Sequence, residues 1–219
     1  MDEKRCVLNT EMVFAFIMAY LIGAIPFSVW VGKIFYGKDV RNYGSHNAGA
    51  TNTFRVLGIR AGAIVLFLDV VKGAVAVSLA YYMGNIPFHE EKFVYYQLGL
   101  GITAALGHIF PVYLRFKGGK GVATFLGVGI SIFPEAALIC IAVFLLVFLI
   151  TRYVSLGSII ASLIFPLVLI FYNHVQQWPL IVFSVSIPLI IIYTHRKNIA
   201  RLLQGTENKI SFSKNKNPK

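Results

Sequence analysis

The chain has 219 residues, of which 57% are hydrophobic and 13% are charged, and its mean hydropathy is +0.72. Soluble domains carry about 25% charged residues, and a 24.3 kDa particle has too little interior to bury this much apolar surface. A soluble globular enzyme is therefore excluded as the default, and lipid must be part of the solvent. The net charge of +11 can indicate a binding partner or a membrane orientation only after the basic residues are located relative to the apolar segments.

The apolar segments predict an all-α integral membrane protein, because a helix needs about 20 apolar residues to cross the hydrocarbon core. Most of the segments suit one crossing each. The longest holds Pro134 and Glu135 at its centre, which fits either one bent helix or a hairpin of two short helices. In chain order the predicted spans are 12–35, 61–84, 93–113, 121–150, 156–173 and 178–194.

The distribution of Lys and Arg predicts the sidedness of these spans, since cytoplasmic loops are enriched in both residues. Basic residues crowd the stretches 33–60 and 115–120, the link at Arg152 and the chain after residue 195, whereas the opposite loops hold only three. Lys120 and Arg152 then share one side, so the chain between them must cross twice. We expect seven transmembrane helices, some of them short, with the N-terminus outside and the C-terminus in the cytoplasm.

This topology implies a simple domain organisation. Residues 1–205 would form a single polytopic membrane domain, and residues 206–219 a polar, basic C-terminal tail that we expect to be disordered. The weakest element is 122–133, which as a helix is only about 18 Å long and cannot cross a full bilayer alone. No internal repeat is apparent, which counts against the transporter folds that are built from repeats.

The first polar motif is Gly-Ser-His-Asn-Ala-Gly-Ala-Thr-Asn at 44–52, followed by Arg55. It has the composition of a loop that presents amides and hydroxyls to an anion, with a basic residue behind. It is not a Walker A loop, because Ala50 stands where that motif requires Lys. An ordinary polar turn between spans explains this segment equally well when it is taken alone.

The second motif begins at Gly107-His108 and continues into Phe-Lys-Gly-Gly-Lys-Gly-Val-Ala-Thr at 116–124. Glycines and lysines directly before an apolar helix favour a phosphate site at the helix N-terminus. Anchoring at the cytoplasmic face would explain Lys117 and Lys120 but not the glycines. His108 alone is weak evidence, because a histidine near the end of a span is more often an interfacial side chain.

Two further polar segments lie at 151–158 and 195–201. His195, Asn198 and Arg201 recur every three residues and would share one face if the last span continues as a helix; a solvated basic tail is the alternative. The predicted topology places all four segments at the cytoplasmic face, so we expect them to form one pocket for phosphate groups beside the lipid. Asp69 and Lys72 lie inside a span and are expected to pair in a structural role.

Several other chemistries are excluded by the residues that the chain lacks. Only three aspartates are present, too few for the multi-aspartate metal site of CDP-alcohol phosphotransferases. No histidine has an aspartate five positions later, as the usual glycerolipid acyltransferases do, and no Gly-x-Ser-x-Gly nucleophile elbow occurs. The two cysteines, Cys6 and Cys140, have neither disulfide-like nor zinc-like spacing.

Four ordered motifs closely resemble the bacterial acyl-phosphate:glycerol-3-phosphate acyltransferases of the PlsY type, and the likeness runs over residues 22–209. They are the motif at 44–52, Gly-His-x-x-Pro at 107–111, the motif at 116–124, and His-Arg-x-Asn-Ile from residue 195 with Gly-Thr-Glu at 205–207. The resemblance implies transfer of a fatty acyl group from acyl phosphate to the 1-hydroxyl of glycerol 3-phosphate, giving lysophosphatidic acid and phosphate in phospholipid synthesis. It implies no cofactor, no metal and no nucleic-acid partner, and a multi-pass protein of the bacterial inner membrane with its active site facing the cytoplasm. His46 departs from the glycine expected in this family, so its local geometry is in question if the loop needs a positive φ.

The resemblance also assigns roles to individual residues. The principal catalytic positions would be Ser45, Arg55 and Lys120, which hold substrate phosphate, and His195 and Asn198, which orient the glycerol. The proton acceptor stays open between a donor phosphate oxygen, His108 and His195. Substrate-contacting and loop-shaping positions would be Asn47, Thr51, Asn52, His108, Lys117, Gly118, Gly119 and Ser155.

Two other classes of function remain compatible with the residues. A transporter or exchanger of phosphorylated metabolites would use a basic vestibule and charges within a span equally well, and a membrane scaffold would need no small ligand. The acyl-chain preference and the oligomeric state, a monomer included, are left open by the sequence.

Overall fold

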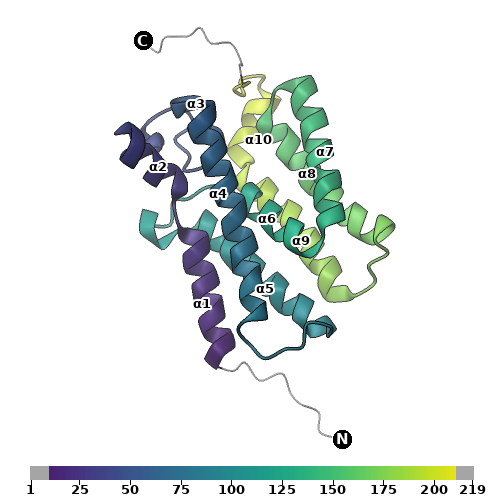
Figure 1. The fold of residues 1–219 in the computed structure, drawn as a ribbon. Helices are drawn as coiled ribbons and strands as arrows, with labels where there is room; N and C mark the ends of the chain where they lie inside the picture. Colours follow the sequence, from purple (N-terminus) through teal and green to yellow (C-terminus); the bar gives the residue numbers. More distant parts are fainter. Residues whose placement is uncertain (1–9, 211–219) are drawn as a thin grey trace, which may run out of the picture. The chain divides into compact units, whose positions relative to one another are not determined.

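The computed structural model describes residues 10–210, and within that range the regular elements are all helices joined by loops, with no strand (Figure 1). It divides into two compact units, Met1–Glu135 and Ala136–Lys219. The helices of the first unit are α1 (Thr10–Ala24), α2 (Phe27–Tyr36), α3 (Ala50–Leu57), α4 (Ile59–Ser78), α5 (Glu91–Ile109) and α6 (Val122–Ile132), with short 3-10 turns η1 (Val40–Asn42), η2 (Leu79–Tyr81) and η3 (Val112–Leu114).

Small residues let the long helices of the first unit approach closely, as is common between helices in membranes. A Cβ atom on Gly23 of α1 would overlap the backbone of Ala104 in α5, and one on Gly73 of α4 would overlap the carbonyl of Thr124 in α6. These two contacts bring α5 against α1 and α6 against α4. Glycine at both positions is therefore a packing requirement.

The predicted span 12–35 is two helices in the structure. α1 and α2 meet at Ile25 and Pro26 with a bend of 43°. Pro26 has no amide hydrogen and disfavours helical geometry at Ile25, which ends α1 at the preceding residue. The prediction of one uninterrupted segment was wrong in this respect, although the pair still qualifies as one broken span.

The long segment 121–150 is also divided, into α6 and α7 (Pro134–Thr151), with Phe133 between them. Proline suits the first position of a helix because its missing amide hydrogen would have no partner there. Of the two alternatives that the sequence left open, the structure has two separate helices. α6, with 11 residues, is about 17 Å long and is too short to cross a bilayer by itself.

The second unit contains α7 from Ala136 onward, α8 (Val154–Leu167) with a π-helical extension η4 (Val168–Tyr172), α9 (Trp178–Thr194) and α10 (Arg196–Leu203). α9 coincides with the predicted span 178–194, and α10 follows after a bend of 65°. In residues 10–210, four helices are long and apolar enough to cross a membrane, or up to six if each bent pair is one span. The described part of the chain is thus all-helical, with four to six candidate membrane spans.

Candidate active site

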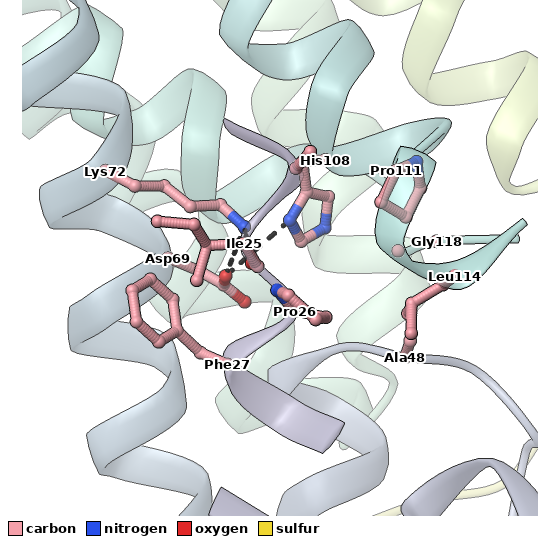
Figure 2. Close-up of a pocket in the computed structure, with 12 residues that line it drawn as sticks. Ile25, Pro26, Phe27, Ala48, Asp69, Lys72, His108, Pro111, Leu114 and Gly118 are labelled. Carbon is pink, nitrogen blue, oxygen red and sulfur yellow. Dashed lines mark hydrogen bonds and ion pairs between the residues drawn. The ribbon is translucent and has the colours of Figure 1, made fainter. Parts of the chain in front are cut away.

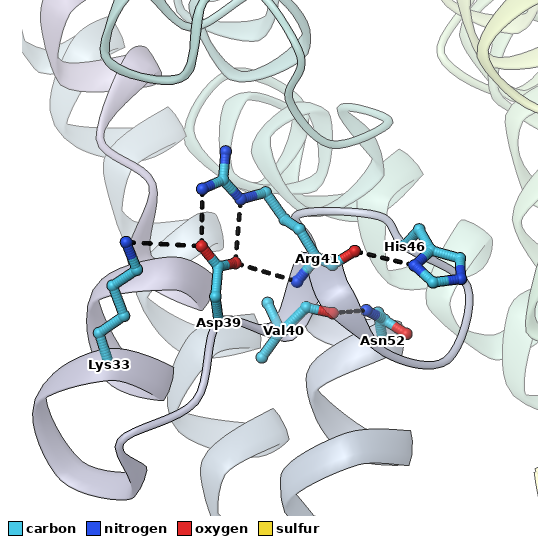
Figure 3. Close-up of polar contacts among 6 residues, drawn as sticks. All are labelled: Lys33, Asp39, Val40, Arg41, His46 and Asn52. Carbon is cyan, nitrogen blue, oxygen red and sulfur yellow. Dashed lines mark hydrogen bonds and ion pairs between the residues drawn. The ribbon is translucent and has the colours of Figure 1, made fainter.

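The first polar motif forms a loop that Asn52 holds from the inside (Figure 3). Asn52 is 1% exposed in the first turn of α3, and its Oδ1 accepts a hydrogen bond of 2.8 Å from the amide of Ser45. Its Nδ2 donates to the carbonyls of Val40, at 2.7 Å, and Tyr43, at 3.2 Å. Because its side-chain amide bonds three backbone groups of the protein, Asn52 shapes the loop.

Five consecutive amides, from residue 47 to residue 51, donate to no acceptor within residues 10–210. They lead into α3, whose N-terminus begins at Ala50. Thr51 and Arg55, both half-buried, are four positions apart and so lie on one face of this helix. Unused amides at a helix N-terminus, with hydroxyl and guanidinium groups nearby, are what an anion site requires.

The turn before this loop is held by an ion cluster around Asp39 (Figure 3). Arg41 donates to both carboxylate oxygens, with Nε 3.0 Å from Oδ1 and Nη2 2.6 Å from Oδ2, and Lys33 Nζ lies 3.5 Å from Oδ2. These hydrogen bonds from Arg41, together with the charges of both basic residues, lower the pKa of Asp39 from 3.8 to about 2. The guanidinium of Arg41 is thus bonded within the turn at 39–42, and this turn supports the loop that follows it.

Replacing Asp39 with alanine is expected to destabilise the protein by roughly 1 kcal/mol at neutral pH, since the cluster is partly exposed to solvent. The pKa of Asp39 is lowered by folding, so its contribution is fully present above about pH 4 and is lost as the pH falls towards 2. Thermal unfolding in detergent from pH 7 downward should show the wild type and Asp39→Ala converging at low pH. A gap between the two that stays constant to pH 2 would contradict this assignment.

His46 has a left-handed backbone, with φ of 57°, and its Nδ1 lies 2.9 Å from the carbonyl oxygen of Arg41. The concern raised by the sequence, that this position needs a positive φ, is therefore confirmed. Left-handed backbone geometry is unfavourable for most residues other than glycine. The hydrogen bond between the His46 ring and the carbonyl of Arg41 offsets part of this conformational cost.

His46→Val is expected to lower the free energy of unfolding by about 1 to 2 kcal/mol, because a β-branched residue tolerates positive φ poorly and valine cannot bond the carbonyl. His46→Gly should stay within about 1 kcal/mol of the wild type, since it relieves the backbone while losing that bond. Unfolding midpoints of the two variants in detergent would test the difference. Equal losses for both would show that the backbone conformation is not what matters.

The second motif is explained in part by packing. The amide of Gly118 donates to the carbonyl of Ile109 at 3.1 Å and that of Gly119 to the carbonyl of His108 at 3.0 Å, so both bind the C-terminal end of α5. A Cβ atom on Gly119 would overlap the His108 ring, and one on Gly118 would overlap the His108 carbonyl. Both amides are therefore used within the fold, and contact between these two glycines and substrate stays a prediction.

Lysines flank this pair of glycines in different environments. Lys117 is exposed, whereas Lys120 is half-buried and directly precedes Gly121, the left-handed N-cap residue of α6. Lys120 therefore lies at the N-terminal end of a helix, where a bound anion is favoured by both the lysine and the helix dipole.

A narrow pocket joins the first and second motifs (Figure 2). Ala48 contributes from the first motif and His108, Gly118 and Gly119 from the second. The break between α1 and α2, two charged residues of α4, and Pro111 and Leu114 complete its lining. Two of the four predicted segments therefore meet within the first unit.

The other two segments meet within the second unit, around the carboxylate of Glu207. Ser155 Oγ donates to Glu207 Oε1 at 3.0 Å, and Asn198 Nδ2 donates to the same oxygen at 2.7 Å. Arg201 Nε donates to Oε2 at 2.7 Å. Burial alone would raise the pKa of Glu207, but the hydrogen bonds from Arg201, Asn198 and Ser155 and the charge of Arg201 outweigh it, so the pKa is lowered.

His195 lies at the bend between α9 and α10 and is 3% exposed. Its Nδ1 is 2.8 Å from the carbonyl oxygen of Ile191. Since a carbonyl can only accept, Nδ1 carries the proton in the neutral ring and Nε2 holds the lone pair. Asn198 follows one turn later, and its amide donates to the carbonyl of His195, so the predicted helical face from 195 to 201 is present.

A family model for glycerol-3-phosphate acyltransferase matches residues 13–205 of the chain. The chain belongs to the glycerol-3-phosphate acyltransferase family. The thirteen candidate residues of the sequence analysis, from Ser45 to Asn198, all lie inside the matched range of this family.

Individual relatives agree with the family. A glycerol-3-phosphate acyltransferase of Fusobacterium nucleatum is 47% identical over 91% of this chain and 98% of its own, and one of Listeria welshimeri is 40% identical over 94% and 100%. Two crystal structures of PlsY, an integral membrane glycerol 3-phosphate acyltransferase, also match. Its glycerol 3-phosphate form has a TM-score of 0.82 at 40% identity over 91% of this chain and 96% of that one. Its lysophosphatidic acid form has a TM-score of 0.80 at 38% identity over 91% and 95%.

Glu207 is the main residue to which the sequence analysis gave no role, although it belongs to Gly-Thr-Glu, because it was placed in the tail 206–219. In the structure it is 6% exposed and bonded to three side chains, which differs from the disorder expected for that stretch; residues 211–219 lie outside the described range. One signal was available in the sequence. Glu207 is the sole acidic residue after Glu135, in a segment dense in Lys and Arg.

Proposed function

We propose that the chain transfers a fatty acyl group from an acyl phosphate to the 1-hydroxyl of glycerol 3-phosphate, producing lysophosphatidic acid and inorganic phosphate. The observation that carries the proposal is the match to PlsY over nearly the full length of both chains, in forms named for glycerol 3-phosphate and lysophosphatidic acid. The unused amides at 47–51 support it independently, because both proposed substrates carry phosphate.

The reaction needs little covalent assistance. The 1-hydroxyl oxygen attacks the carbonyl carbon of the acyl phosphate, the bond from that carbon to the phosphate oxygen breaks, and phosphate departs with the electron pair. An acyl phosphate is a mixed anhydride and is already activated, so positioning and charge neutralisation can supply most of the acceleration. No covalent enzyme intermediate is required.

In this proposal the first two motifs bind phosphate. Ser45, Arg55 and Lys120 hold the phosphate oxygens, while Asn47 and Thr51 contribute polar groups at the amides that lead into α3. Asn52 acts through the loop that it holds. Lys117, which is exposed, adds positive charge at the entrance.

Ser155, His195 and Asn198 orient the glycerol hydroxyls in this proposal. The hydroxyl proton leaves to a phosphate oxygen of the donor or to Nε2 of His195, whose Nδ1 is already bound to Ile191. In this proposal His108 does not accept the proton, because its ring packs between the Gly119 backbone and the charged residues of α4.

A detergent assay with purified protein tests the function. Palmitoyl phosphate and glycerol 3-phosphate should yield phosphate and lysophosphatidic acid in equal amounts. The measurement also separates an enzyme from a transporter, because detergent solution has no compartments between which a metabolite can be moved. Absence of product, under conditions in which an established enzyme of the family turns over, would reject the proposal.

We further propose seven membrane segments in a bacterial inner membrane, with the N-terminus outside and the candidate site facing the cytoplasm. The excess of Lys and Arg in the loops on one side supports this orientation. In a background without native cysteines, His89→Cys should react with a membrane-impermeant maleimide in intact spheroplasts. Arg115→Cys should react only after permeabilisation, and the reverse pattern would refute the orientation.

A further inference from the structure

Two charges lie deep in the first unit, in the middle of α4. Asp69 is 2% exposed and Lys72 is 3% exposed, and Lys72 Nζ lies 2.8 Å from Asp69 Oδ1. A single charge at this depth costs about 2.5 to 3.5 kcal/mol on insertion scales. Pairing explains how the charges are tolerated but not why they are present, because an apolar pair of the same size often gives equal or greater stability.

Each member of the pair also contacts a different segment (Figure 2). Lys72 Nζ donates to the carbonyl of Ile25 at 3.0 Å, in the break between α1 and α2, and lies 5.6 Å from the centre of the Phe27 ring. Asp69 Oδ1 lies 3.6 Å from His108 Nδ1, near the end of α5. The pair therefore connects three elements of the first unit.

His108 extends this connection to the second motif. Its carbonyl accepts the amide of Gly119, and its ring lies so close to Gly119 that any side chain there would overlap it. Lys120 is the next residue along the chain. A change in the position of the His108 ring would therefore displace the backbone that carries Lys120.

We infer that Asp69 and Lys72 are positioning residues for acyl transfer, which fix Lys120 for phosphate binding by holding His108 against Gly119. This inference rests on the proposed function, since it takes Lys120 to bind substrate phosphate. Neither Asp69 nor Lys72 contacts substrate in this scheme. Their effect passes through the His108 ring and the Gly118–Gly119 backbone.

The test uses variants that keep size while removing charge, namely Asp69→Asn, Lys72→Met and the neutral double variant Asp69→Leu/Lys72→Met. The double variant leaves no unpaired buried charge and so should fold. We expect kcat/KM per folded molecule to fall at least 10-fold, and inhibition by inorganic phosphate to weaken by a similar factor. A merely structural role would reduce the unfolding midpoint and the yield but leave both quantities unchanged. Ser78→Ala, a polar change near the end of the same helix, is the control.

A double-mutant cycle tests the route through His108. If Asp69 acts through the ring, Asp69→Asn should have little further effect on kcat/KM in a His108→Gln background. Additive losses would overturn the route, and normal kinetic constants in the folded charge variants would overturn the inference. Failure of all charge variants to fold would assign the pair to folding alone and also overturn it. An inactive wild type would remove the proposed function, whereas an active wild type with unaffected variants would remove only this inference.

Discussion

Replacing Lys120 with alanine is expected to lower kcat/KM for acyl transfer by at least about 100-fold while the protein stays folded. Negative charge accumulates on the phosphate oxygens as the acyl–oxygen bond breaks. In the proposed reaction a lysine at the N-terminal end of α6 would stabilise that charge together with the helix dipole. Most of the loss should appear in kcat, because the charge is larger in the transition state than in the bound substrate.

The measurement is phosphate release in detergent, normalised to folded protein. Lys120→Arg keeps the charge and should recover part of the activity, whereas Lys92→Ala, an exposed lysine in the first turn of α5, should leave it unchanged. Ser45→Ala is expected to reduce turnover in the same way through loss of a hydroxyl donor. Near-normal rates in both Lys120→Ala and Ser45→Ala would remove this site assignment without affecting the membership of the family.

The spans were predictable where hydrophobic length alone decides the structure. The segment 178–194 coincides with α9 because a polar stretch precedes it and a basic segment follows the bend at His195. The break at Pro26 had a local signal, since proline excludes helical geometry at the preceding residue, but a search for apolar length passes over it. α3 was missed inside the polar stretch 36–60 because eight residues give too weak a periodic pattern.

The site was less predictable, because its geometry depends on contacts between distant positions. Gly118 and Gly119 are visible in the sequence, but their reason for being glycine is the ring and carbonyl of His108. Asn52 has a polar side chain compatible with ligand binding, yet it bonds backbone groups up to twelve positions away. No local sequence pattern contains these contacts. The sequence could therefore show which residues are polar, but only the structure shows which of their groups bond other parts of the protein.

Replacing Glu207 with glutamine is expected to lower the free energy of unfolding by about 2 to 4 kcal/mol and to raise the KM for glycerol 3-phosphate at least 10-fold. Ser155, Asn198 and Arg201 all donate to this carboxylate. The glutamine side chain has one acceptor oxygen where the carboxylate has two. Its amide nitrogen is a donor and would face the donor groups of these three residues. Ser155 and Asn198, the residues proposed to orient the glycerol, would then lose their common support.

The pH dependence of stability distinguishes this role from a general packing effect. Because folding lowers the pKa of Glu207, its contribution is fully present above about pH 4.5 and is lost as the pH falls through the lower value of the folded state. The unfolding midpoints of wild type and Glu207→Gln should therefore converge on acidification, while the exposed control Glu90→Gln should match the wild type throughout. A variant that is less stable by the same margin at every pH, with an unchanged KM, would assign Glu207 to packing and leave the orientation of Ser155 and Asn198 to other contacts.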